Sequence, residues 1–205
     1  TTQLATPEEA VHNRLYAFRD YNYAYGPPVS APTTITETTT DLYDATANNL
    51  GTFTGAALDS EKTIIKGKKG FYIDLKEPSS ITLPNGLTTI WVGEKGLAKT
   101  VIFGGVLYAT TYVPANDLTA VQTCAAAEGQ GRVYAINYLS GTPVFDLTGD
   151  SALDRSKPAG GGIPSEPVIV IREGGVTGLV GTSGGAASVN AKSTGNKYRT
   201  YWYDE

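Results

Sequence analysis

Three aspartates recur at every fourth position of one short segment, at Asp146, Asp150 and Asp154. Carboxylate oxygens are the ligands that calcium prefers, so three of them on one loop could gather around that ion. A common calcium loop, however, alternates its ligands at every second residue, has a central glycine and ends in a bidentate acid, and this segment lacks that pattern. The sequence therefore favours an ordinary polar turn, keeps calcium as the alternative, and predicts no other metal or cofactor.

Groups that catalyse hydrolysis are present without the partners that such catalysis needs. Asp74, Asp146 and Glu166 could supply the carboxylate pair of a glycoside hydrolase, but the sequence gives no separation that would pair them. Ser165 would need His12, the only histidine, which lies far earlier in the chain and is expected in a surface or hydrogen-bonded role. We therefore predict no catalytic residue.

One cysteine, Cys124, lies in an expected loop between two strands. A single thiol cannot form an intramolecular disulfide. In an exported protein, an unpaired cysteine often bonds to another chain, whereas elsewhere it behaves as a small buried apolar residue. Both interpretations stay open, and the first makes Cys124 a candidate for an intermolecular disulfide.

Charge and composition argue against nucleic-acid, nucleotide and membrane-spanning roles. The net charge is −4 and the pI is about 5.1, which gives no attraction for phosphate backbones. The basic cluster of Lys66, Lys68 and Lys69 is expected to be a solvated turn. The run Gly160-Gly161-Gly162 is followed by neither Lys-Ser nor Lys-Thr, so it is expected to be a flexible turn rather than a phosphate-binding loop. Since no run of 18 apolar residues occurs, no membrane span is expected.

The composition predicts many short strands and few helices. The chain has 24 Gly, 11 Pro and 13 Tyr, no Met, and only 18% charged residues. We expect one domain over residues 1–205, with a loop-rich insertion at 21–50, an extended edge at 33–40, and helical turns at 6–9 and 58–62. The expected strands are 14–19, 51–54, 71–75, 89–92, 100–103, 106–113, 132–138, 143–145, 168–171, 176–180 and 199–203.

A tetrad of an apolar residue, tyrosine, alanine and a fourth residue marks three of these strands. It occurs as Leu15-Tyr16-Ala17-Phe18, Leu107-Tyr108-Ala109-Thr110 and Val133-Tyr134-Ala135-Ile136, each expected to be buried. β-Propellers repeat a four-stranded blade every ~40–50 residues, with one aromatic-containing strand in each. The roughly twelve strands predict an all-β fold, a partial β-propeller of about three four-stranded blades. Three blades cannot close into a ring, so another polypeptide or other copies of this chain would have to cover the ends of the arc. A β-sandwich is the alternative fold.

The order of motifs along the chain carries a resemblance to one family. The segments that carry it are 14–20, 42–44, 69–75, 93–95, 101–114, 132–141 and 161–168. On this set the chain resembles, over about residues 14–202, the C-terminal part of the PilY-type type IV pilus biogenesis and tip adhesin proteins. The resemblance implies a modified β-propeller in an exported protein of the bacterial cell surface, pilus-associated or extracellular. The alternating-acid calcium loop that regulates the pilus in that family has no counterpart in this sequence.

These observations predict a non-enzymatic structural and binding module that serves pilus biogenesis or adhesion and completes its fold with another chain. The expected partners are pilus subunits, together with copies of the chain itself or a second polypeptide that supplies the remaining blades. A precursor cut ahead of Thr1 would provide such a polypeptide. Two alternatives stay open: a fragment of a quinone-type propeller dehydrogenase, and a carbohydrate-binding surface protein whose aromatic segment 21–25 stacks on sugars.

Overall fold

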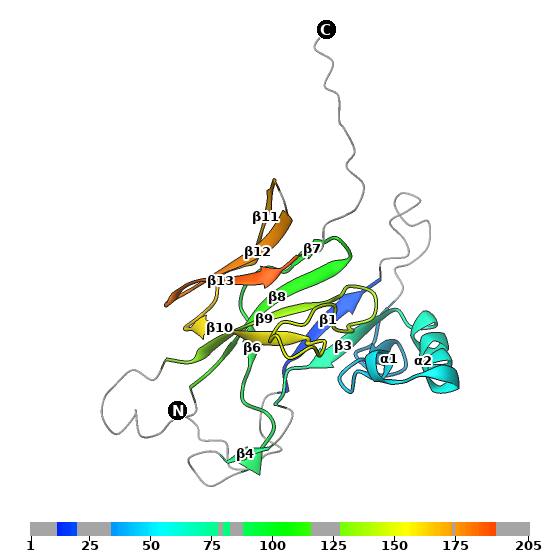
Figure 1. Ribbon diagram of the computed structural model, residues 1–205. Coiled ribbons are helices and arrows are strands. Elements are labelled where there is room, and N and C mark those ends of the chain that lie inside the picture. Colours follow the sequence, from blue (N-terminus) through cyan, green and yellow to red (C-terminus); the bar gives the residue numbers. More distant parts are fainter. Residues whose placement is uncertain are drawn as a thin grey trace.

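The computed structural model describes residues 12–19, 34–77, 80–82, 88–115, 128–173 and 175–191. Strands dominate this part of the chain, which confirms the expected all-β class (Figure 1). The elements, in chain order, are β1 (Arg14–Phe18), β2 (Leu42–Asp44), α1 (Asn49–Thr52), α2 (Gly55–Lys66), β3 (Gly70–Asp74), β4 (Ile81–Thr82), β5 (Thr88–Thr89), β6 (Lys95–Gly96), β7 (Val101–Phe103), β8 (Val106–Val113), β9 (Gln130–Asn137), β10 (Ser156–Gly161), β11 (Val168–Arg172), β12 (Gly175–Thr182) and β13 (Gly185–Asn190).

The central sheet has the order β10-β9-β8-β6, and β7 also pairs with β8. Its longest ladder joins β8 to β9 antiparallel, from Val106 opposite Asn137 to Val113 opposite Gln130. The β7–β8 hairpin turns at Gly104 and Gly105, whose φ angles of 59° and 80° are both left-handed. Two successive left-handed residues are what a two-residue hairpin turn of type I′ requires, so glycine is needed at both.

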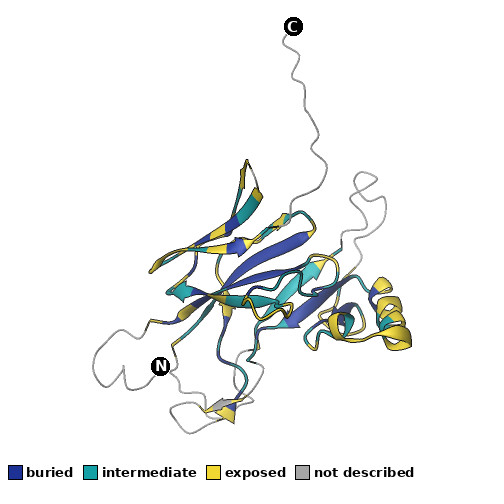
Figure 2. Ribbon diagram, viewed as in Figure 1, coloured by how far each residue is buried: buried dark blue, intermediate teal, exposed yellow. Residues whose placement is uncertain are grey.

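The central hairpin is buried on both faces, which explains its unbroken apolar sequence. Leu107 and Ile136 belong to a core cluster shared with β3, whereas Tyr108 and Val133 belong to a second cluster shared with β12 and β13. Figure 2 shows these strands as the dark blue centre of the molecule. The tetrads of β8 and β9 are therefore buried as expected, but the tetrad of β1 is only half-buried and its Phe18 is exposed.

The first sheet has the order β1-β3-β2 and packs its apolar residues on one side of the centre. β3 pairs antiparallel with β1 and parallel with β2, and α1 and α2 form the crossover between β2 and β3. Within the range expected to be a loop-rich insertion, residues 34–41 have no strand or helix, but β2 is buried in the core. Residues 21–33 lie outside the described part of the chain.

The third sheet has the order β11-β12-β13 and covers the other side of the centre. Val180 of β12 and Val189 of β13 are buried against the second core cluster. A small sheet of β4 and β5 stands apart from these three. The sheets thus contain three, five, three and two strands, and a grouping into four-stranded blades is not shown, so the propeller stays a prediction.

Several expectations about local structure were wrong. Of the strand expected at 89–92 only Thr89 is in a strand, and the one expected at 143–145 has only two isolated bridges. Residues 34–40 form turns rather than an extended edge, because Asp41 Oδ2 accepts hydrogen bonds from the Thr36 amide and hydroxyl, both at 2.7 Å. The expected strand at 51–54 is instead the end of α1 and the turn into α2, since the amides of Thr52 and Phe53 bond back to the carbonyls of Asn48 and Asn49. Gly160 and Gly161, expected in a flexible turn with Gly162, instead belong to β10 and pair with β9.

The lysine cluster is less solvated than expected. Lys69 Nζ lies 2.7 Å from Asp41 Oδ1, and Lys68 Nζ donates to the carbonyl of Thr40 at 3.0 Å. These contacts tie the turn after α2 to residues 34–41, so the cluster has a structural role. Among the described residues, no helix has the length and apolar character needed to cross a membrane.

Candidate functional site

β11 is one of the two outer strands of the third sheet, and its outer edge is unpaired among the described residues. In the described part of the chain it pairs only with β12, from Val168 opposite Leu179 to Arg172 opposite Gly175. The backbone groups on its other side therefore have no ladder partner among these residues. An unpaired strand edge is a template for another strand, and natural proteins usually protect such edges with charges or bulges.

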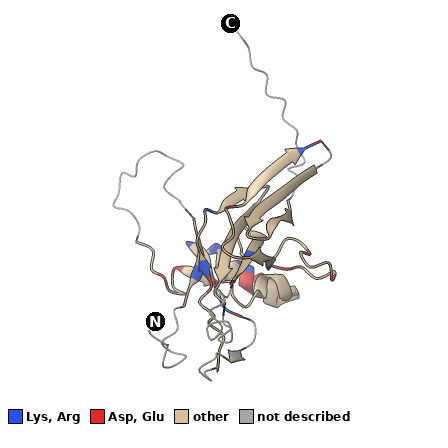
Figure 3. Ribbon diagram, turned by 90° about the vertical axis from the view of Figure 1, so that its left-hand side faces the viewer, with Lys and Arg blue, Asp and Glu red and all other residues tan. Residues whose placement is uncertain are grey.

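This edge is apolar and exposed. The side chains of Val168 and Ile171 are 52% and 68% exposed, and Ile169 and Val170 between them are half-buried. Figure 3 shows the long outer strands almost free of charged residues, apart from the basic and acidic residues at the hairpin end. Four consecutive β-branched residues favour the extended conformation. The strand therefore combines open backbone groups with apolar surface, the two features that strand addition uses.

The strands behind the edge hold it in place. Val180 and Val189 are almost fully buried against the central hairpin, so β12 and β13 are fixed to the core. The Ser165 amide donates to the Gly181 carbonyl at 2.8 Å, and the Gly181 amide donates to Ser165 Oγ at 2.9 Å. Ser165, weighed above as a nucleophile, thus anchors the chain that leads into β11. The edge is preorganised, which lowers the entropy lost on docking.

A buried network of charged and hydroxyl groups lies on the face of the central sheet that faces away from the third sheet. Glu94 is fully buried, and its Oε1 accepts hydrogen bonds from the hydroxyls of Thr111 at 2.5 Å and Tyr134 at 2.8 Å. Its Oε2 lies 3.0 Å from Arg132 Nη1, and Arg132 Nη2 lies 2.8 Å from Glu77 Oε1. Burial and the charge of Glu94 raise the pKa of the Tyr134 hydroxyl, so this group stays protonated and donates at neutral pH.

A polar cleft of about 420 Å³ borders this network and is lined by residues of the first and central sheets. Arg155, the residue directly before β10, reaches toward the first sheet. Its Nη1 donates to the Thr46 carbonyl at 2.8 Å, and its Nη2 donates to Asn48 Oδ1 at 3.2 Å. Burial lowers the pKa of the Arg155 guanidinium, which remains charged at neutral pH. Because groups of the chain itself hold Arg132 and Arg155, these guanidinium groups join the two sheets.

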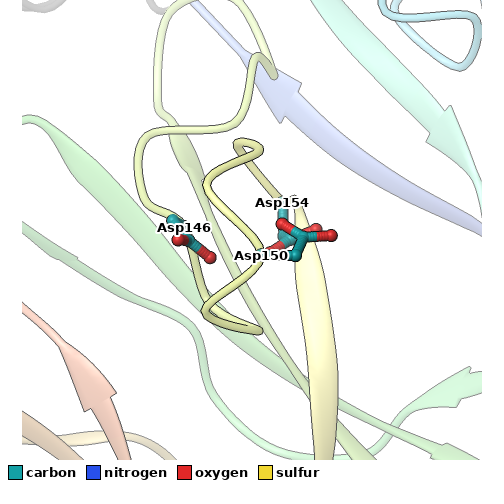
Figure 4. A group of neighbouring side chains, drawn as sticks. All are labelled: Asp146, Asp150 and Asp154. Carbon is teal, nitrogen blue, oxygen red and sulfur yellow. The ribbon is translucent and has the colours of Figure 1, made fainter.

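The structure brings together the three aspartates that the sequence singled out. Asp146, Asp150 and Asp154 lie on the loop between β9 and β10, with ligand oxygens within 4.8 Å of one another (Figure 4). Their oxygens already accept hydrogen bonds from that loop: Asp146 from the amides of Gly149 and Ser151, Asp150 from Ala152, and Asp154 from Leu147 and Thr148. A calcium ion would compete with these donors. The geometry therefore supports the expected polar turn, with the aspartates ordering the loop, and calcium stays the alternative.

The hydrogen bonds of Asp154 predict a contribution to stability that acid removes. The Thr148 hydroxyl bond, followed by the Leu147 and Thr148 amide bonds, outweighs burial and lowers the pKa of Asp154 below its usual 3.8. A lowered carboxyl pKa stabilises the fold above the unfolded-state value, and this contribution disappears as pH falls through the folded-state value. We expect Asp154→Asn to lower the melting temperature at about pH 6 and to flatten its fall from about pH 4 downward.

Calorimetric melting curves of the Asp154→Asn variant across this acid range measure the effect. Asp150→Asn is the matched control, because Asp150 accepts a bond from one amide, that of Ala152. The control should follow the unmodified protein closely. If the melting temperature of Asp154→Asn fell with decreasing pH as steeply as that of the unmodified protein, Asp154 would not be the source of this acid-sensitive stability.

The other residues weighed from the sequence lie on several different segments of the chain. Cys124 is outside the described residues, so neither interpretation of its thiol is tested. The exposed His12 ring stacks on Trp91, with ring centroids 3.9 Å apart. Asp74 forms an ion pair with Arg14 at 2.8 Å, and Glu166 is exposed just before β11. The three carboxylates considered for glycoside hydrolysis thus lie on three separate segments, and those of Asp74 and Asp146 have partners nearby.

Comparisons of this chain with protein-family models, with curated proteins and with solved structures found no match.

Sequence reasoning missed the Glu94 network and the edge position of β11. Arg132 carries a detectable signal, because a charge directly precedes the apolar run of β9 and such charges need a partner. Nothing in the local sequence, however, identifies Glu94 as that partner. The apolar run of β11 predicts a strand, but which strand lies at an edge depends on pairings between distant segments.

Proposed function

We propose that this chain is a non-enzymatic structural and binding module of a type IV pilus or related cell-surface filament. In this proposal the chain is exported to the bacterial surface and serves pilus biogenesis or adhesion by joining another chain at β11. The observation that carries the binding role is the exposed apolar edge of β11, with Val168 and Ile171 more than half exposed. The pilus assignment is supported by the resemblance of the ordered sequence motifs to the PilY-type proteins.

Strand addition at β11 accounts for how a partial β-propeller could be completed. An arc of blades leaves an edge that a second polypeptide, a pilus subunit or another copy can extend. The interaction needs backbone hydrogen bonds and apolar contact, and both are available at β11. Catalysis is not needed for this role, and the carboxylates of Glu94 and of the aspartate loop have hydrogen-bond partners within the chain.

Photo-crosslinking in the bacterium that makes the protein tests the proposal. A photo-reactive phenylalanine analogue replaces Ile171 at the edge; the control replaces Leu153, which is 61% exposed on the aspartate loop away from β11. We expect the Ile171 position, and not the Leu153 position, to yield adducts with a filament subunit or with a polypeptide from the same precursor, identified by mass spectrometry. Equal adducts from both positions, or adducts only with proteins unrelated to a surface filament, would overturn the proposal.

A further inference from the structure

The chain around β11 has a charge pattern that fits a second copy of itself. The segment Glu166-Pro167-Val168-Ile169-Val170-Ile171-Arg172 carries an acid at one end, a base at the other and apolar residues between them. Glu166 and Arg172 are both exposed. When such a strand lies antiparallel to its own copy, the acid of each strand meets the base of the other. We propose that two copies of this chain pair through β11, antiparallel and centred on Ile169.

The register follows from the side chains that must lie opposite one another. With Ile169 on the two-fold axis, Val168 of one copy lies opposite Val170 of the other, and Pro167 lies opposite Ile171. Glu166 then lies opposite Arg172 at both ends of the paired strands. Every apolar residue faces an apolar residue and both charges are matched, and each such cross-strand pair stabilises a sheet.

The register shifted by one residue pairs the side chains less favourably. Centring the pair on Val170 places Arg172 opposite Val168 of the second copy and leaves Glu166 beyond the end of β11. An apolar residue then faces a charge at each end, and Glu166 faces a position beyond the second copy's Arg172, so the two Arg–Glu pairs are lost. Pro167 marks the end of the ladder in either case, because proline has no amide hydrogen to donate and is tolerated at edges for that reason.

The pairing is closed rather than fibre-forming. A two-fold contact uses the same surface on both copies and leaves none free for a third. The other outer strand of the sheet, β13, also pairs only with β12 among the described residues, and β10 of its own chain lies in contact with both β12 and β13. The two three-stranded sheets would thus join into one six-stranded sheet across the dimer, with the free edge of β11 removed.

Charge reversal at the two ends tests the register. Sedimentation equilibrium of the full chain is measured for Arg172→Glu, for Glu166→Arg and for the variant with both changes. Each single change places like charges opposite one another twice per dimer, so we expect dimerisation to weaken about tenfold. The double variant restores both pairs in reversed order and should return to within about threefold of the unmodified chain. Both residues are exposed, so we expect the variants to keep the fold, which circular dichroism checks.

Disulfide trapping provides a second measurement of the same register. The background is Cys124→Ser, which removes the only native thiol. A mixture of Val168→Cys chains and Val170→Cys chains should form mixed dimers, whereas Val170→Cys alone should not. The inference would be overturned if Val170→Cys chains formed disulfides with one another faster than with Val168→Cys chains. It would also be overturned if the double charge variant dimerised as weakly as the single variants. A chain that stays monomeric up to about 1 mM would overturn it as well.

The inference rests on the proposed function for the role of the β11 edge, but the two can fail separately. Adducts at Ile171 with a filament protein, together with a monomeric chain in solution, would refute self-pairing and leave the proposed function standing. A β11-paired dimer, with Ile171 adducts only to the second copy, would support self-pairing and remove the filament partner.

Discussion

Replacing Glu94 with alanine is expected to lower the free energy of unfolding by about 3–5 kcal/mol, the range for breaking a buried ion pair from one side. Glu94 is fully buried and accepts hydrogen bonds from Thr111, Tyr134 and Arg132. Its removal leaves the Arg132 guanidinium with Glu77 as its remaining acidic partner and leaves two buried hydroxyls without an acceptor. The cost comes from these orphaned groups more than from the lost attraction itself. Urea unfolding followed by circular dichroism measures it.

Two further variants distinguish the loss of the Glu94 network from the general effect of replacing a glutamate with alanine. Glu173→Ala removes an exposed carboxylate beside the β11–β12 turn and should change stability by less than about 0.5 kcal/mol. Arg132→Met should itself be costly, but adding it to Glu94→Ala should cost less than the sum, because both changes remove the same contact. Additive effects, or a Glu94→Ala variant as stable as Glu173→Ala, would show that the network does not stabilise the fold.

The elements that could be predicted from the sequence are those whose signals are local. The predicted bounds of the central strands β8 and β9 lie close to the observed ones. Both faces of these strands are buried, so their apolar runs are unbroken and easy to identify. The turn at Gly104 and Gly105 was identified because a two-residue hairpin needs left-handed backbone that glycine supplies. The fourfold spacing of the aspartates predicted their grouping on one loop, though their oxygens bond to the loop's own amides.

The elements that were missed depend on contacts between distant segments. β10 contains three glycines or prolines among its six residues and has weak strand propensity, yet it pairs with the buried strand β9. β2 is only three residues long and joins β3 in parallel across two helices, and so short a segment gives no local signal of this pairing. The pairing of Glu94 with Arg132 was missed for the same reason, since the two residues are 38 positions apart in the sequence.

A methyl group added at Gly70 is expected to lower the free energy of unfolding by about 3 kcal/mol, the upper end of the range for overpacking. Gly70 begins β3 and lies opposite Phe18 of β1. A Cβ atom there would lie 2.1 Å from the Ala17 carbonyl oxygen and 3.0 Å from the Phe18 Cα. Both atoms belong to the backbone of β1, so no side-chain rotation can make room. β1 would have to move away, and the 2.8 Å bond from the Arg19 amide to the Lys69 carbonyl would weaken.

Gly184→Ala is the matched control for Gly70→Ala, because a Cβ at Gly184, in the turn between β12 and β13, would meet nothing within 4 Å. This variant should unfold at nearly the same urea concentration as the unmodified chain. Hydrogen exchange adds a local measurement: Gly70→Ala should speed exchange of the β1 amides before those of β8 and β9, because only the β1–β3 contact is strained. Equal stability of the two glycine variants would mean that β1 is not packed against β3 as closely as the structure places it.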